Sequence, residues 1–268
     1  MDNLFDISKE IIVLTGVNGI LGSEYANYLL MQNATVIGLD LNKNEKSLYL
    51  IEKHKSKFRF FECDITSSSS LSSTILTIVN EIGVPTVLIN NAAIDSPPSS
   101  TIEENGPFED YPESSWDKVM NVNLKGAFLC CQCFGREMVK NKKGTIINIS
   151  SIYGMVSPDQ TLYEYRRKNG EDFYKPVAYS VSKSGILNLT RYLANYWGGK
   201  GISVNTLTLA GVYNSQDESF LKEYKARIPI GRMAQATDYF GALHFLCSDS
   251  SNYMTGANMV VDGGWTSK

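Results

Sequence analysis

The chain has 268 residues, of which 43% are hydrophobic and 20% charged, values typical of a globular protein with a sizeable core. Its formal net charge is −3 and its lysines and arginines are scattered, so neither a nucleic-acid partner nor binding to a membrane surface is expected. No apolar run approaches the roughly 18 residues that a membrane-spanning helix needs.

Short β-rich runs alternate with longer stretches of helical periodicity along the whole chain. This alternation predicts an α/β fold with a single Rossmann-type, doubly wound parallel sheet that carries helices on both faces, in one domain over residues 1–268. The predicted strands are 11–15, 34–40, 58–64, 86–92, 144–150, 202–210 and 258–264. The predicted helices are 20–32, a charged stretch ending near residue 54, one that begins in the serine run 66–74, and 114–140, 178–197 and 236–248.

Three segments that follow predicted strands are unusually long, namely 93–113, 152–177 and 211–235. Ligands of a doubly wound sheet bind at the carboxyl ends of its strands. Loops of this length are uncommon unless they serve a function. We therefore expect all three segments to border a ligand site at one edge of the sheet.

The segment TGVNGILG, residues 15–22, connects the first predicted strand to the first predicted helix. Gly16 permits a tight turn, Gly19 lets the backbone approach a pyrophosphate, and Gly22 lets the helix pack closely on the strand. The free N–H groups at the start of the helix then face the anion. This strand–turn–helix setting favours a dinucleotide site over an ordinary glycine turn.

Asp40 lies at the end of the second predicted strand. A carboxylate at this place accepts hydrogen bonds from both ribose hydroxyls of an adenosine and repels a 2′-phosphate. We therefore predict NAD rather than NADP as the cofactor. Lys43 lies nearby in the sequence and would soften that repulsion, and a solvated turn aspartate is the alternative interpretation.

Two tyrosine–lysine pairs have the spacing of one helical turn, Tyr49 with Lys53 and Tyr179 with Lys183. Such a pair lies on one face of a helix. The helix of Tyr179 follows the predicted strand 144–150 and begins near the ligand edge, whereas the charged helix of Tyr49 is expected on the outside of the sheet. Context therefore favours Tyr179 and Lys183 as the functional pair, although the spacing alone does not choose.

Several short motifs follow one another in a fixed order along the chain. They are TGVNGILG, CDI, NNAA, VNL, NISSIYG, YSVSK and VDGG. Each is loose by itself, but their order and placement together are specific. On these motifs the chain resembles the short-chain dehydrogenase/reductase family over nearly its whole length. The resemblance implies hydride transfer between a nicotinamide cofactor and a hydroxyl or carbonyl carbon.

The resemblance implies four catalytic residues. Tyr179 is the implied acid/base, Lys183 its partner, Ser151 the donor to the substrate oxygen and Asn123 the residue of a water relay. Ser151 rather than Ser150 is implied, because the serine of the family stands three residues before the glycine that ends NISSIYG, here Gly154. A nearby ammonium and the positive nicotinamide both favour the phenolate, so we expect the pKa of Tyr179 to fall from about 10 toward neutral pH.

The resemblance also implies a cofactor site built from the glycine turn and the ends of neighbouring strands. The implied residues are Gly16, Asn18, Gly19, Ile20, Leu21, Asp40, Asp64, Ile65, Asn91, Ala92 and Val212, together with Tyr179 and Lys183. In this arrangement Lys183 also bonds the nicotinamide ribose.

The segment between Ser151 and Tyr179 is longer than is usual in the family, and it begins and ends beside catalytic residues. Arginine binds phosphate or carboxylate in a bidentate manner, and tyrosine lies against sugar rings. We expect the segment to shape the substrate pocket; for any single basic residue, a solvated loop whose charges cancel against nearby carboxylates is the alternative. The basic residues are Arg166, Arg167, Lys168 and Lys175.

Three segments resemble one particular branch of the family, namely SPDQTLYE, YSVSKSGILNLTRYLANYW and SSNYMTGANMVVDGGWT. They are similar to the bacterial branch called flagellin modification protein A, which is associated with making sugars of the nonulosonic-acid type for surface glycans. The implied substrate is a small polar molecule such as a sugar, sugar phosphate or nucleotide sugar. Two alternatives stay open: a short-chain reductase of another polar carbonyl (acyl or cyclitol), and a non-catalytic NAD-binding sensor or scaffold.

Cellular setting and assembly are predicted from scattered features. The polar N-terminal segment MDNLFDISKE predicts no secretion signal. The five cysteines form no CxxC pair and only His54 and His244 could join them at a metal, so we expect reduced thiols in the cytoplasm, helix packing by CCQC and no bound metal. The family resemblance implies a homo-oligomer, a dimer or tetramer, formed through the helices 114–140 and 178–197.

Overall fold

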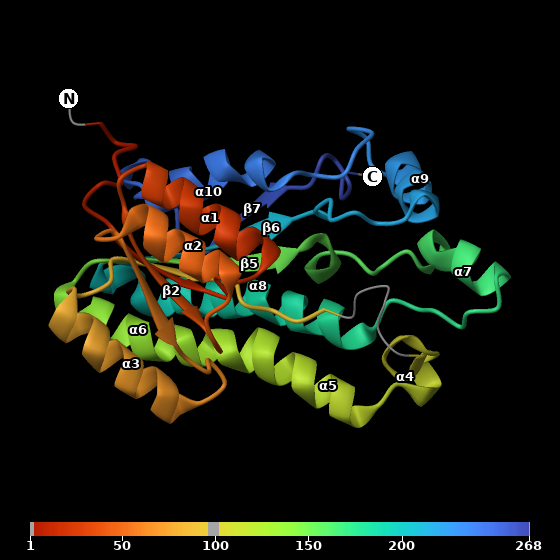
Figure 1. The fold of residues 1–268 in the computed structure, drawn as a ribbon, viewed down its shortest axis with the longest axis horizontal. Coiled ribbons are helices and arrows are strands. Elements are labelled where there is room, and N and C mark those ends of the chain that lie inside the picture. The colour runs from red at the N-terminus through yellow and green to blue at the C-terminus, as the bar shows by residue number, and fades with distance from the viewer. Residues whose placement is uncertain (1–2, 96–101, 268) are drawn as a thin grey trace.

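A parallel sheet runs through the described part of the computed structural model, which comprises residues 3–95 and 102–267 (Figure 1). Its seven strands have the order β3-β2-β1-β4-β5-β6-β7, and each neighbouring pair is parallel. This order, which reverses direction at β1, is that of a doubly wound Rossmann sheet, so the predicted fold class is confirmed. The strands are β1 (Ile11–Thr15), β2 (Thr35–Asp40), β3 (Phe58–Glu62), β4 (Val87–Asn90), β5 (Gly144–Ser151), β6 (Ile202–Leu209) and β7 (Asn258–Val261).

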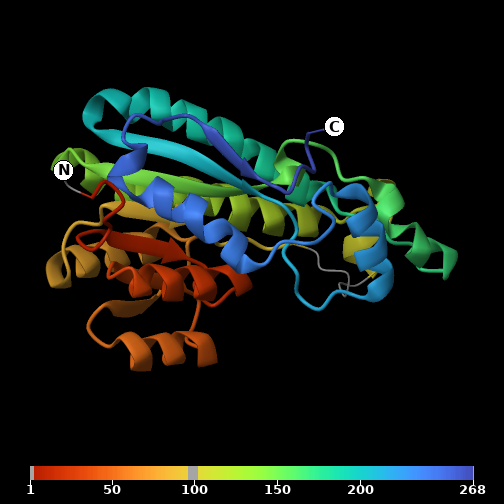
Figure 2. The same cartoon turned by 90° about the horizontal axis from the view of Figure 1, so that it is seen from above.

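Helices cover both faces of the sheet (Figure 2). Successive residues of a strand point to opposite faces, so Ile12 and Leu14 join one hydrophobic cluster and Val13 joins the other. The first cluster is closed by α1 (Ile20–Met31), α2 (Glu45–His54) and α10 (Phe240–Cys247). The second is closed by α3 (Ser68–Glu81), α6 (Ala127–Asn141) and α8 (Val177–Trp197).

The helix predicted over 114–140 is a succession of three helical segments. They are α5 (Glu113–Met120), a π-helical segment (Asn121–Gly126) and α6. The π-helical turn holds extra residues, which rotates the side chains that follow it. Because an apolar stripe tolerates such a rotation, the periodicity of the sequence did not reveal it.

Cysteine packing agrees with the sequence analysis. Cys130 and Cys131 of α6 are buried and Cys133 is half-buried, and all three thiols are free. Their place in the second hydrophobic cluster confirms that the CCQC segment packs against the sheet. Among the helices of the described residues, none combines the length and apolar character needed to cross a bilayer.

The three long segments after the strands carry short helices of their own. These are α4 (Ile102–Asn105), α7 (Glu164–Lys168) and α9 (Glu218–Arg227). All three helices gather at one end of the molecule, away from the N-terminus and at the right of Figure 1. This is the end at which the strands present their carboxyl termini.

Side-chain contacts join the segment 152–177 to α9. The ring of Tyr163 lies 6.0 Å from that of Phe220 within a third hydrophobic cluster. The hydroxyl of Tyr165 donates to the carboxylate of Asp217 at 2.9 Å. The guanidinium of Arg227 donates to the carboxylate of Asp159 at 2.9 Å. The two segments thus form one wall beside the carboxyl ends of β5 and β6.

Candidate active site

The glycine turn between β1 and α1 has a geometry that only glycine accommodates. Gly16 has a φ of +69°, and a Cβ there would lie 2.8 Å from the Cα of Ala92. A Cβ on Gly22 would lie 2.1 Å from the carbonyl oxygen of Gly16. Gly19 caps α1 without a side-chain hydrogen bond, so the first N–H groups of the helix are left for an anion.

Asp40 lies beside this turn at the end of β2. Its Oδ2 accepts a hydrogen bond from the N–H of Asn18 at 2.9 Å and its Oδ1 accepts from the following N–H at 2.9 Å. Each carboxylate oxygen retains a lone pair for a ribose hydroxyl, and the buried Oδ1 of Asn18 has no hydrogen-bond partner within the described residues. Lys46, which we did not predict, brings its ammonium within 3.4 Å of the carbonyl of Gly19.

Two neighbouring cavities meet at Tyr179. The first, of about 680 Å³, extends from the glycine turn, and the second, of about 310 Å³, lies against β5, β6 and the wall formed by 152–177 and α9. Of the predicted cofactor residues only Lys183 is outside the first cavity, and it lines the second. The others that line the first are Gly16, Asn18, Gly19, Ile20, Leu21, Asp40, Asp64, Ile65, Asn91, Ala92, Tyr179 and Val212.

The structure brings together three of the four predicted catalytic side chains. Ser151 is the last residue of β5, and its hydroxyl lies beside the phenol of Tyr179, whose pKa it lowers. The ammonium of Lys183 lies 5.9 Å from the centre of the Tyr179 ring and donates to the carbonyl of Ile149 at 2.9 Å. Ser150 instead donates to the backbone carbonyl of Lys183 at 2.9 Å, so Ser151 is the serine that faces the phenol.

Asn123, the fourth, lies in the π-helical segment and is among the lining residues of neither cavity. Its Oδ1 accepts from the N–H of Ile94 at 2.8 Å, and its Nδ2 donates to the carbonyl of Ile94 at 2.9 Å and to Ser182 at 3.1 Å. The side chain therefore positions the segment after β4 against α8. A water relay at this residue stays a prediction.

The second tyrosine–lysine pair has different surroundings. Tyr49 is 54% exposed on α2, and the ammonium of Lys53 lies 5.1 Å from its ring centre. That ammonium also donates to Asn27 at 3.0 Å. Neither residue lines the two cavities, which agrees with the expectation that this pair faces solvent.

The proton affinities of the catalytic groups are dominated by burial. Removal from water raises the pKa of Tyr179 well above its ordinary value, the negative charge of Asp95 raises it further, and the hydrogen bond to Ser151 opposes both. Burial lowers the pKa of Lys183 to about 8, and Asp95 opposes that shift. The expected fall in the phenol pKa is thus wrong for the protein alone, because burial and the carboxylate of Asp95 both favour the neutral phenol.

Comparison with known proteins identifies the family. A protein-family model described as enoyl-(acyl carrier protein) reductase matches residues 16–266. A solved short-chain dehydrogenase from Leptospira borgpetersenii, with bound NAD+, is similar with a TM-score of 0.87 and 31% identity, over 99% of this chain and 96% of that one. This chain belongs to the short-chain dehydrogenase/reductase family.

Curated relatives of this short-chain dehydrogenase/reductase act on hydroxylated molecules, by their names. The D-threitol dehydrogenase of Mycolicibacterium smegmatis is 28% identical over 98% of this chain and 95% of its own length. The 2-dehydro-3-deoxy-D-gluconate 5-dehydrogenase of Bacillus subtilis is 28% identical over 100% of this chain and 99% of its own length. The first name describes a neutral polyol enzyme and the second a sugar-acid enzyme.

Three of the four basic residues in the long segment of this short-chain dehydrogenase/reductase are held within that segment. Arg166 pairs with Glu171, with a 2.7 Å hydrogen bond, and Lys168 pairs with Glu164 at 3.4 Å. Arg167 donates to two backbone carbonyls at 2.8 and 2.7 Å. For Arg166 and Lys168 the alternative of charges cancelled by nearby carboxylates is observed, whereas Arg167 supports the backbone of the segment.

Lys175 differs from the other three, because it is buried beside the reacting groups. Its ammonium donates to both carboxylate oxygens of Asp95, at 2.6 and 2.5 Å, and lies 5.2 Å from the centre of the Tyr179 ring. Asp95 was missed by the sequence analysis. The available signal was a carboxylate placed two residues beyond the NNAA motif, in a strand-following loop.

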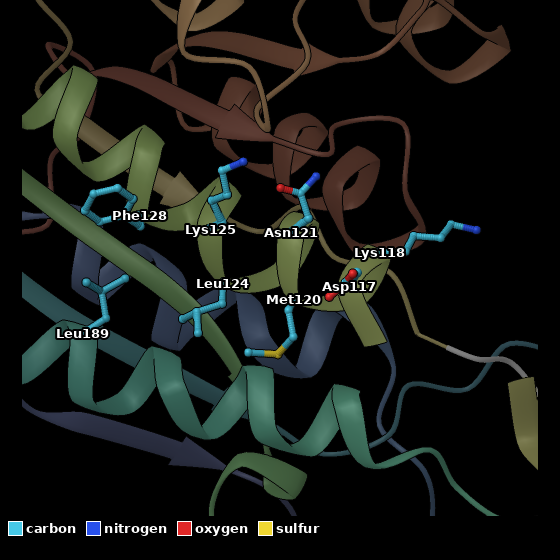
Figure 3. Close-up of a pocket in the computed structure, with 8 residues that line it drawn as sticks. All are labelled: Asp117, Lys118, Met120, Asn121, Leu124, Lys125, Phe128 and Leu189. Carbon is cyan, nitrogen blue, oxygen red and sulfur yellow. The ribbon is translucent and has the colours of Figure 1, made fainter. Parts of the chain in front are cut away.

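A third cavity lies apart from the reacting groups. It is an open groove of about 790 Å³ between the α5–α6 helical run and α8 (Figure 3). Phe128, Met120 and Leu124 give it an apolar floor, with Leu189 of α8 opposite. This groove lies on the helices through which the family resemblance implies oligomerisation. Its complete lining is Asp117, Lys118, Met120, Asn121, Leu124, Lys125, Phe128 and Leu189.

Proposed function

We propose that this protein transfers a hydride between NAD and a hydroxyl or carbonyl carbon of a small, polar, hydroxylated substrate, with residues 1–268 acting as one catalytic domain. The observation that carries the proposal is the convergence of Ser151, Tyr179 and Lys183 where the two cavities meet. A non-catalytic NAD-binding scaffold would need no such convergence. The curated relatives, which are dehydrogenases of polyols and sugar acids, support the same reaction class.

The cofactor, when bound, supplies the hydride acceptor or donor. The residues of this chain bind and orient the substrate, and they exchange a proton with it. Ser151 and Tyr179 hold the substrate oxygen by hydrogen bonds, and Tyr179 takes the hydroxyl proton in oxidation or returns it in reduction. Lys183, whose ammonium faces the phenol ring, stabilises the phenolate that forms. Ser151 and Lys183 are buried and Tyr179 is half-buried, which limits the access of bulk water to the reacting groups.

NAD is proposed in preference to NADP. Asp40 presents its carboxylate at the nucleotide end, where it favours two free ribose hydroxyls and repels a 2′-phosphate. The ammonium of Lys46 lies at the glycine turn, and its positive charge is the feature that favours NADP. Titration of the protein with both oxidised cofactors tests this choice: we expect tighter binding of NAD, and tighter binding of NADP would overturn it.

The reaction is tested by adding NAD and a panel of alditols, sugars, sugar acids, sugar phosphates and nucleotide sugars, and following the absorbance of reduced nicotinamide. Reduction of the cofactor by at least one polar member supports the proposal. Activity confined to apolar alcohols would contradict it. The non-catalytic alternative predicts NAD binding without turnover by any member of the panel.

The biological setting is also a proposal. The resemblance of three segments to the flagellin modification branch supports a substrate that is a sugar intermediate of surface-glycan synthesis, made in the cytoplasm.

The assembly of the protein is a separate proposal. The apolar groove of Figure 3 supports a homo-oligomer, since it combines Phe128, which is 44% exposed, with residues of α5 and α8. Sedimentation of the wild type and of a Phe128→Glu variant tests the assembly; a wild-type monomer would contradict it.

A further inference from the structure

Two lysines lie beside the ring of the catalytic phenol, and they come from different parts of the chain. The ammonium of Lys183, one helical turn further along α8, lies 5.9 Å from the centre of the Tyr179 ring. The ammonium of Lys175, in the long segment before α8, lies 5.2 Å from the same point. The YSVSK motif accounts for the first lysine and not for the second, although the second is the nearer of the two.

Both ends of Lys175 are fixed. Its backbone N–H donates to the side-chain amide of Gln160 at 2.9 Å, and its carbonyl accepts from the same amide at 3.1 Å. Its ammonium donates to both carboxylate oxygens of Asp95, at 2.6 and 2.5 Å. These contacts hold the positive charge beside the phenol ring, because they restrain the long side chain that carries it.

The two members of this ion pair differ in their contact with water. The side chain of Lys175 is 7% exposed, whereas that of Asp95 is 41% exposed. Water screens a charge that it reaches and screens a buried charge much less. The carboxylate of Asp95 acts on the phenol in the opposite sense to the ammonium, but it is the more strongly screened of the two. The buried ammonium therefore acts on the phenol with less loss.

The other ionisable groups around the phenol do not favour its anion, apart from Lys183. The ionisable groups that line the catalytic cavity with Tyr179, among the described residues, are Asp95, Tyr153, Tyr163, Lys175, Lys183 and Tyr224. The dinucleotide cavity adds Asp40, Cys63 and Asp64. Burial raises the pKa values of the three other phenols, so they stay neutral. Within this part of the chain, the two lysines are the groups whose charge stabilises a phenolate.

We propose that Lys175 is a second positioning residue of the proton transfer: its ammonium acts through Tyr179 and stabilises the negative charge that the phenol oxygen carries when its proton has left. No bond forms or breaks at Lys175, since the proton moves between the phenol and the substrate oxygen. The inference rests on the proposed function, in which Tyr179 exchanges that proton. The site thus uses two ammonium groups, where the family motif supplies one, to offset the partial removal of the phenol from water.

A direct titration of the phenol tests the inference without any substrate. Tyr179 is replaced with 3,5-difluorotyrosine, whose fluorines bring the phenol pKa down toward neutral pH, and fluorine NMR follows its ionisation in the protein saturated with NAD. Lys175→Met should raise the pKa of this phenol by about 1 unit, since it removes an adjacent positive charge. An unchanged or lowered pKa overturns the inference.

Two further variants separate charge from shape. Lys175→Arg keeps a positive charge at this position, so its phenol should titrate closer to the parent than that of Lys175→Met does. Lys168→Met is the matched control, because Lys168 belongs to the same segment and its side chain is 77% exposed. Its titration should equal that of the parent. A shift in the control as large as that in Lys175→Met would overturn a specific role for Lys175.

Turnover gives a second readout. With Tyr179 in place, Lys175→Met should lower kcat/KM for the best substrate about tenfold at neutral pH, and the loss should shrink as the pH rises. A loss that is independent of pH would show that Lys175 only supports the cavity wall, and it overturns the inference. If the wild type turns over no polar substrate, the proposed function fails, and the titration still decides the role of Lys175.

Discussion

Two tyrosine–lysine pairs with the same helical spacing have opposite surroundings in this protein. On α2, Tyr49 and Lys53 lie in solvent and contact each other through the ring face. On α8, Lys183 is buried and Tyr179 is half-buried where two cavities meet, with Ser151 beside the phenol. The comparison teaches that spacing provides a shared face, whereas burial and neighbouring charges change the proton affinities.

The largest expected difference between the pairs is in turnover. Tyr179→Phe removes the proton-transfer group, so kcat/KM for the best substrate should fall roughly 100- to 10,000-fold. Tyr49→Phe makes the same chemical change on α2 and should leave kcat/KM unaltered. Initial rates of cofactor reduction measure both, with NAD affinity determined alongside. Equal losses in the two variants, or near-normal turnover of Tyr179→Phe, would break the comparison.

The lysines give a second contrast. An adjacent ammonium lowers the pKa of an acid by about 1 to 3 units, so Lys183→Met should reduce kcat/KM at neutral pH by roughly 10- to 1,000-fold. The loss should shrink as pH rises, since hydroxide then ionises the phenol without help. Lys53→Met is the control and should retain the wild-type pH–rate profile. A loss that is independent of pH would show that Lys183 acts by position and not by charge.

The pH dependence of the unfolding free energy gives a third contrast between the two lysines. Burial lowers the pKa of Lys183 to about 8, whereas an unfolded lysine has a pKa of about 10.4. Between these values the unfolded chain holds a proton that the folded protein lacks, so this group makes the unfolding free energy rise with pH. Relative to Lys183→Met, the wild type should therefore gain about 2 kcal/mol between pH 7 and pH 10.

Urea denaturation at several pH values measures this gain. The difference between wild type and variant cancels the opposing ionisation of buried cysteines, whose pKa values burial raises. Lys53→Met should show no such pH-dependent difference from the wild type. A constant gap between the wild type and Lys183→Met across the range would contradict the buried ammonium.

The smallest expected effect is a change in melting temperature when the exposed pair of Tyr49 and Lys53 is broken. A cation–π contact at an exposed site contributes about 0.5 kcal/mol, so Lys53→Met should lower the melting temperature by only about 1–2 °C. Thermal unfolding followed by circular dichroism measures the change. A drop several times larger would mean that α2 depends on this pair for its packing.

Much of the architecture was predictable because it follows from local patterns. The alternation of strands and helices fixed a parallel sheet, and the turn at Gly16 requires glycine for steric reasons that are visible in the motif. The expected lengths of the last strands were too generous, since β7 ends at Val261. Strand ends depend on where pairing with the neighbour stops, which the residues themselves do not specify.

The substrate side was less predictable because its contacts join distant residues. The sequence singled out four basic residues in one segment but could not tell that Arg166 and Arg167 turn back on that segment. Lys175 was among the candidates, whereas its partner Asp95 lies 80 positions away and was not. Charge pairing of this kind is decided by the packing of loops, for which no periodic signal exists.

The carboxamide of Asn123 has a practical consequence for anyone who wishes to reshape this pocket. It bonds both backbone groups of Ile94 and the hydroxyl of Ser182, and so locks the chain leading to Asp95 onto the helix of Tyr179. Displacing that chain by design would disturb dinucleotide and substrate contacts at once. Apart from the bond between Lys175 and Asp95, the wall formed by 152–177 and α9 is fastened by its own side chains, and its α9 side is the safer place to re-engineer specificity.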